Sequence, residues 1–104
     1  MKEKLLKIIN NYGVIPQLKY LQSEVFEFNE AIIRNDELEK CYYDDYGSNY
    51  LKEARKHIIE EFADLMVMLE QFKVYYNLSN EDIMKTMEYK IERQLKRIEE
   101  ENKR

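Results

Sequence analysis

Four acidic residues form two pairs in which the partners stand three positions apart, Glu24 with Glu27 and Glu61 with Asp64. Residues three apart lie on the same face of a helix, so each pair would present two carboxylates side by side. If the two segments pack as antiparallel helices, both pairs meet across one cleft. Carboxylates gathered in this way repel one another unless a cation lies between them, and hard oxygen ligands suit Mg²⁺ or Mn²⁺. The spacing is therefore typical of a magnesium site, with Mn²⁺ as the second candidate ion.

Asp64 is the most informative of these acids because it lies within the apolar stretch FADLMVML. We expect its side chain to be buried, and a buried carboxylate without a partner is strongly destabilising. A metal ion would compensate, and so would a salt bridge to Lys90 or Arg93. Glutamate pairs such as Glu24 and Glu27 are also common on solvated helix faces. On the residues alone, these alternatives stay open.

Long helices have to position the acids, and the composition favours them. Charged residues make up 37% of the 104 residues, while glycine occurs twice and proline once, so little of the chain is suited to turns. Helix start and stop signals predict four helices. They span Lys2 to Asn11, Pro16 to about Arg34, Ser48 or Asn49 to about Tyr76, and Ser79 almost to the end, with YYDDYGSN read as a loop. We expect one all-α domain over residues 1–104, a four-helix-bundle-like arrangement of long antiparallel helices.

Apolar residues recur at steps of three and four along three of these helices, a pattern typical of helix faces that pack in a core. The three stripes are Leu18, Leu21, Val25, Phe28 and Ile32; Leu51, Ala54 or Arg55, Ile58, Phe62, Leu65, Leu69, Phe72 and Tyr76; and Met84, Met87, Ile91, Leu95 and Ile98. We expect these stripes to form the seam between helices, with the acids one position before it. Apolar residues off the main stripe of the third helix, such as Ile59 and Met66, leave more apolar surface than a thin bundle covers. We therefore expect a homodimer or homotetramer that buries the third helix against another copy.

Charge and cysteine content narrow the partners. A net charge of −4 and a pI of about 5.1 provide no basic field for nucleic acid, so we expect no nucleic-acid partner. No apolar run approaches the length of a membrane span, so we expect no membrane partner either. One cysteine, Cys41, and an N-terminus without a signal-peptide pattern favour the reducing cytoplasm.

Three segments, SEVFEFNEA, HIIEEFADLMVMLE and YKIERQLKR, resemble in this order the MazG-like family of all-α nucleoside triphosphate pyrophosphohydrolases. That family also includes the dimeric dUTPases and the dCTP pyrophosphatases. Its signature is E-E-x-x-E on one helix, E-x-x-D on a later helix, and K-x-x-R near the end. The matching residues are Glu24 and Glu27 for the first motif, Glu61 and Asp64 for the second, and Lys90 and Arg93 for the third. The resemblance spans roughly Gln17 to Arg97.

The resemblance implies a nucleoside triphosphate substrate, in particular a deoxynucleoside triphosphate, bound through Mg²⁺ and cleaved to a monophosphate and pyrophosphate. The four acids would be both the metal ligands and the catalytic residues. Lys90 and Arg93 would stabilise charge on the departing pyrophosphate. Gln17 and Tyr20, on the same helix row as Glu24, are candidates to face the nucleobase.

Two positions depart from the family pattern and leave a second function open. Ser23 stands where the family usually has the first glutamate of E-E-x-x-E, and Glu88 stands where an asparagine often precedes the lysine. These departures favour the alternative of a catalytically weakened helical module that binds nucleotides or another protein. A di-iron carboxylate bundle is excluded, because it needs Glu-x-x-His on two helices and His57 is the only histidine.

Overall fold

The computed structural model describes residues 1–41 and 45–103. These residues form four helices and no strand, α1 (Lys2–Tyr12), α2 (Val14–Cys41), α3 (Asp45–Tyr75) and α4 (Asn80–Asn102). The predicted all-α class and the number of helices are confirmed. None of the helices in these two ranges combines enough length and apolarity to cross a membrane.

Gly13 makes the turn between α1 and α2. Its backbone φ of 95° lies in the left-handed region that glycine adopts without strain. Its N–H donates to the Ile9 carbonyl at 2.7 Å, and its own carbonyl accepts from the Gln17 N–H at 3.2 Å. Pro16 lies in the first turn of α2. The N–H groups of that turn have no acceptor within the helix, so the missing N–H of proline costs no helical hydrogen bond there. The predicted start at Pro16 is therefore two residues late.

The far end of α2 differs more from the prediction, since the helix continues past Arg34 to Cys41. The polar residues that suggested a break instead pair along the helix: Asn35 donates to Glu39 at 2.9 Å, and Lys40 lies 2.8 Å from Asp36. Such pairs four residues apart support a helix. On the other side of the connection, α3 begins at Asp45. The second part of the predicted loop is therefore wrong, because it is helical. The first part, residues 42–44, lies outside the described ranges.

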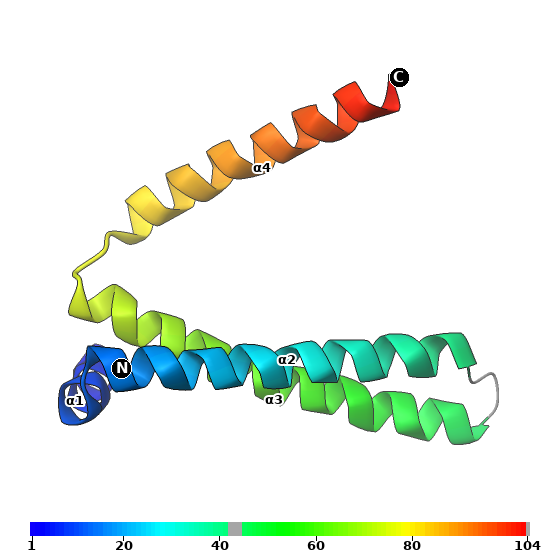
Figure 1. The fold of residues 1–104 in the computed structure, drawn as a ribbon, viewed down its shortest axis with the longest axis horizontal. Helices are drawn as coiled ribbons and strands as arrows, with labels where there is room; N and C mark the ends of the chain where they lie inside the picture. The colour runs from blue at the N-terminus through cyan, green and yellow to red at the C-terminus, as the bar shows by residue number, and fades with distance from the viewer. Residues whose placement is uncertain (42–44, 104) are drawn as a thin grey trace.

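Helices α2 and α3 form a long antiparallel hairpin, and α1 crosses one end of it (Figure 1). The antiparallel arrangement predicted for these two helices is confirmed. Helix α1 contributes Leu5 and Ile9 to the buried core and contacts both α2 and α3. The hairpin thereby brings the middle of α2 opposite the middle of α3.

The seam of this hairpin is built from residues spaced seven apart. The buried residues in this spacing are Gln17, Glu24 and Ala31 on α2, and Ala54, Glu61 and Met68 on α3; Gln71, three positions after Met68, is buried as well. The predicted seam was the neighbouring apolar stripe, and this prediction is correct only in part. Ala54 is buried and six other residues of the stripes are partly buried, namely Leu21, Phe28, Leu51, Ile58, Leu65 and Phe72. In contrast, Leu18, Val25 and Ile32 are each more than 40% exposed. Ala31 and Ala54 are 2% and 4% exposed, and their short side chains suit a position between two packed helices. The exposed members of the apolar stripe, Leu18, Val25 and Ile32, are left on the flank of the seam.

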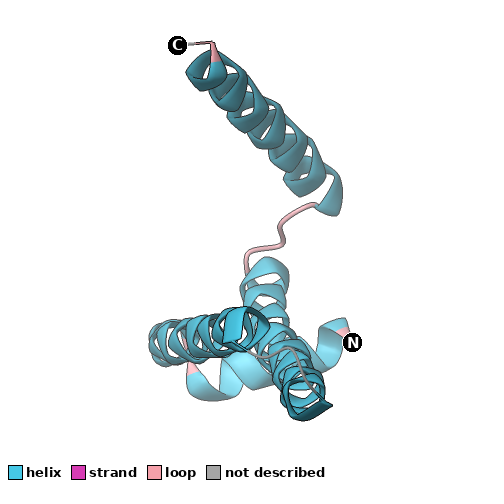
Figure 2. Cartoon of the chain, turned by 90° about the vertical axis from the view of Figure 1, so that its right-hand side faces the viewer, coloured by secondary structure: helices cyan, strands magenta, loops and turns pink. Residues whose placement is uncertain are grey.

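Helix α4 stands apart from the other helices of the chain (Figures 1 and 2). It makes no contact with α1, α2 or α3 and buries none of its residues, so its apolar stripe does not pack in the chain as expected. The turn before it is well defined. Asn77, at φ 52°, closes α3 with hydrogen bonds from its own N–H to Val74 and from the Leu78 N–H to Lys73. The Ser79 hydroxyl accepts from the Asp82 N–H at 3.3 Å, which confirms the predicted start of this helix.

Candidate metal centre

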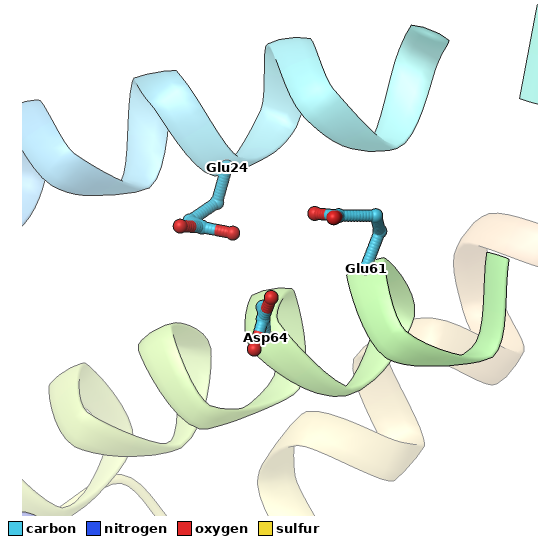
Figure 3. Close-up of side chains that lie close together, drawn as sticks. All are labelled: Glu24, Glu61 and Asp64. Atoms are coloured by element: carbon cyan, nitrogen blue, oxygen red, sulfur yellow. The ribbon is translucent and has the colours of Figure 1, made fainter. Parts of the chain in front are cut away.

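Three of the four predicted acids meet between the two long helices. Glu24 extends from the middle of α2, and Glu61 and Asp64 extend from α3 one turn apart, into the space between the helices (Figure 3). One carboxylate oxygen from each residue lies within 4.8 Å of the other two. The arrangement gives oxygen ligands on one side of a site and leaves the remaining positions of an ion to water or a substrate.

Two of these carboxylates are buried and incompletely paired. Glu24 is 5% exposed and Glu61 is 8% exposed. The Oε2 atom of each is buried without any hydrogen-bond partner. A carboxylate oxygen in that state lacks the hydration or hydrogen bonding that its charge requires. The atoms present therefore fit a hard divalent cation, which would supply the missing interaction for both oxygens.

Asp64 is exposed, so the prediction that it is the buried acid is wrong. The apolar residues next to Asp64 in the sequence lie on several faces of α3. Helix α2 covers only the face that carries Glu61 and Met68. Asp64 lies at the edge of the seam, where its carboxylate still reaches the two glutamates. The desolvation that was expected at Asp64 falls instead on Glu24 and Glu61.

The acids shift one another's protonation. Burial raises the pKa of Glu24 above its ordinary value, and the charge of Glu27 raises it further. Burial likewise raises the pKa of Glu61, with added repulsion from Glu27 and Asp64. His57 partly opposes this rise in the pKa of Glu61, and its Nε2 lies 3.9 Å from the Glu61 carboxylate. Without a cation, the site favours protonated glutamates.

Glu27, the fourth predicted ligand, is not part of the group of three. It is exposed, and its carboxylate is not among the atoms that lie within 4.8 Å of one another. Its charge nevertheless raises the pKa of both buried glutamates, so it lies at the rim of the same site. A position at the rim suits a group that acts on water rather than on the ion directly.

A cavity of about 530 Å³ adjoins the acids, with α1 at one side and the α2–α3 hairpin at the other. The candidate nucleobase residues Gln17 and Tyr20 both line it, as do Glu24 and Asp64. The Tyr20 hydroxyl donates a hydrogen bond to Glu24, which raises the pKa of Tyr20. The cavity is therefore continuous with the acidic group and large enough for a planar ring.

Gln71 lines the cavity, and the sequence predicted only that it shares a helix row with Glu61 and Asp64, without a role in the site. It is 1% exposed, and its Oε1 accepts a 2.7 Å hydrogen bond from Gln17 Nε2. Its own Nε2 lies 3.7 Å from the Met68 sulfur. The available signal was its position seven residues after Asp64, which places both residues on one face of α3.

Lys90 and Arg93 are not brought to the acids within one chain. Both lie on α4, which contacts none of the other helices, and Arg93 instead lies over the Tyr89 ring at 5.9 Å. In the described part of the chain no lysine or arginine forms an ion pair with Glu24, Glu61 or Asp64. The salt bridge considered for Asp64 is therefore not made in the chain.

No protein-family model, no curated protein and no solved structure matches this chain. The case for a function therefore depends on the geometry and chemistry of the chain itself.

Proposed function

We propose that the chain is a Mg²⁺-dependent nucleoside triphosphate pyrophosphohydrolase, a cytoplasmic enzyme that releases pyrophosphate and a nucleoside monophosphate. The observation that carries this proposal is the pair of buried Oε2 atoms of Glu24 and Glu61, which have no hydrogen-bond partner. Together with Asp64 they offer three oxygen ligands beside a cavity of about 530 Å³. A hard cation at the acids and an organic ligand in the cavity would use both features at once.

The residues around the site have distinct roles in this proposal. Glu24, Glu61 and Asp64 hold the ion, and when bound, Mg²⁺ supplies positive charge against the phosphate oxygens and makes water a better nucleophile. Glu27, at the rim, accepts a proton from the attacking water. The Tyr20 hydroxyl holds Glu24 in place through its hydrogen bond. Gln17 and Gln71 form the polar part of the cavity against which the base would lie.

The first test measures the ion alone. Calorimetry with Mg²⁺ and with Mn²⁺ is expected to show binding that Glu61→Gln removes. Glu60→Gln is the matched control, because Glu60 is an exposed neighbour outside the group of three acids and should leave binding unchanged. Equal binding by the wild type and by Glu61→Gln would overturn the metal site.

The second test measures the reaction. Pyrophosphate release is expected from at least one member of a panel of ribo- and deoxyribonucleoside triphosphates, and Asp64→Asn should abolish it. A separate observation favours the alternative of a nucleotide-binding module: among the residues that the structure describes, no lysine or arginine forms an ion pair with Glu24, Glu61 or Asp64. Thermal stabilisation by Mg²⁺ and nucleotide together, without pyrophosphate release from any member of the panel, would establish that alternative and reject the enzyme.

A further inference from the structure

Two apolar faces of this chain have no partner within it. One is the stripe of α4, formed by Met84, Met87, Ile91, Leu95 and Ile98, each about half exposed. The other is a face of the α2–α3 hairpin, formed by the exposed members of the rows that were expected to be the seam. We propose that these two faces pack against each other between two copies of the chain, so that α4 of each copy covers the hairpin of the other.

The hairpin face is continuous across both helices. Successive helical residues are rotated by about 100°, so in an antiparallel pair the row that follows the seam residue turns to the same side on both helices. On α2 this row holds Leu18, Val25 and Ile32, and on α3 it holds Phe62 and Leu69. The edge-to-face contact of Phe28 with Phe62, with ring centroids 6.0 Å apart, joins the helices on that side. Asp64 lies three positions after the seam residue Glu61, and Tyr20 lies four positions before the seam residue Glu24. Both side chains therefore turn to the opposite side of the hairpin.

The size of the exposed surface indicates a second copy. The chain exposes 8885 Å², whereas a compact monomer of 12.8 kDa exposes about 6,300 Å². The radius of gyration is 18.2 Å, against about 13 Å for a compact chain of this length. The excess exposed surface is about 2,600 Å² per chain, or roughly 5,000 Å² for two chains. Obligate homodimers at the upper end of their size range bury an area of about this size. A small partner or a short peptide would leave most of it exposed.

Among the symmetric pairings of two copies, only a reciprocal arrangement covers both faces. Pairing α4 with α4 would leave the hairpin face in water, and pairing hairpin with hairpin would leave the α4 stripe in water. A two-fold axis that places each α4 on the other hairpin buries both and closes the assembly at two chains. The turn from Asn77 to Ser79, closed by hydrogen bonds at both ends, holds α4 away from its own hairpin.

Charge supports the same pairing. From Lys85 to Arg97, α4 carries five basic and two acidic residues. Helix α2 carries six acidic and three basic residues. The two ends of α4 are acidic, so the whole helix carries seven acidic and five basic residues, and only its middle segment from Lys85 to Arg97 would be attracted to the acidic hairpin. The acidic site opens on the other side of the hairpin, so the assembly leaves it accessible and the proposal does not depend on the proposed function.

The test begins with mass and matched substitutions. Sedimentation at micromolar concentration is expected to give twice the 12.8 kDa chain mass. Ile91→Asp and Val25→Asp should each give monomers with helical circular dichroism retained. The controls Tyr89→Asp and Phe26→Asp change exposed residues of the same helices that point away from the proposed faces, and should leave the dimer intact. A wild-type monomer, or equal effects of test and control substitutions, would overturn the proposal.

Cross-linking then separates the possible pairings. A photoreactive residue is placed at Leu69, and ¹⁵N-labelled and unlabelled chains are mixed before irradiation. The expected product joins α3 of one isotopic form to α4 of the other. Cross-links within one chain would show that α4 folds back on its own hairpin, and cross-links between two hairpins would show a different interface; either result rejects the exchange of α4.

Discussion

Gln17 and Gln71 face each other across the α2–α3 seam, where the Gln17 Nε2 donates a 2.7 Å hydrogen bond to the Gln71 Oε1. Both side chains are buried, and both line the cavity beside the acids. The contact joins residues 54 positions apart in sequence. It therefore fixes the polar wall of the cavity and the alignment of the two helices together.

Removing one partner of this amide pair should destabilise the fold. Gln71→Leu leaves the Gln17 Nε2 buried without its acceptor, so the free energy of unfolding should fall by about 1–3 kcal/mol. The double substitution Gln17→Leu with Gln71→Leu should recover part of that loss, because no unpaired amide remains. Urea denaturation of all four proteins at one chain concentration measures the coupling. Simple additivity of the two single substitutions would contradict a direct interaction.

Asp64→Asn should abolish Mg²⁺-dependent pyrophosphate release with little change in melting temperature. The reason is that Asp64 is an exposed residue, so its loss affects the ion more than the packing. Activity assays and thermal melts of the metal-free protein check the two halves of this prediction. Glu60→Gln serves as the control for an acid on the same helix outside the group. Full activity in Asp64→Asn would show that Asp64 is not a ligand.

Glu24→Gln should stabilise the metal-free protein by an amount that grows with pH. The pKa of Glu24 is raised by burial, so the folded state retains a proton that the unfolded state loses above its ordinary pKa of 4.5. The wild type therefore loses stability as pH rises from about 4.5 through the raised pKa of Glu24, and the glutamine variant is spared this loss. Melting curves across that range, with exposed Glu30→Gln as control, should show no gap at the acidic end and a widening gap above it. Saturating Mg²⁺ should reverse the order of the two proteins. A gap that stays constant with pH would contradict the assignment.

Lys90→Ala and Arg93→Ala should leave Mg²⁺ affinity unchanged, since α4 makes no contact with the acids in the chain. Turnover should also change little, because the proposed dimer places α4 on the side of the hairpin away from the acids. A fall of roughly tenfold or more would instead show that these cations stabilise the departing pyrophosphate, and would contradict that dimer. Calorimetry and steady-state assays measure the two effects separately, and Lys85→Ala on the same helix is the control. Loss of Mg²⁺ binding itself would identify the two residues as structural partners of the acids.

Local signals in the sequence account for the features that were predicted correctly. The glycine turn at Gly13, the Ser79 cap and the spacing of Glu61 and Asp64 on α3 all act within a few residues, and the structure has them where expected, whereas Glu27 lies outside the group of three acids. The choice of the face that joins α2 to α3 is a tertiary effect. The apolar row and the row with Glu24 are one position apart, and local sequence signals do not decide which of them turns toward the other helix. The exposure of Asp64 follows from that same choice.

The heptad spacing of the seam has a consequence for how the hairpin selects its register. Coiled helices with a uniformly apolar seam can slide by seven residues at little cost, and polar residues at seam positions prevent this. Here a slide of one heptad would place Glu24 opposite Met68 or Ala54, away from the other acids, and would separate Gln17 from Gln71. A carboxylate facing only apolar neighbours is a costly alternative. The polar residues of the seam therefore lower the stability of the hairpin, but they allow the two helices to pair in only one register.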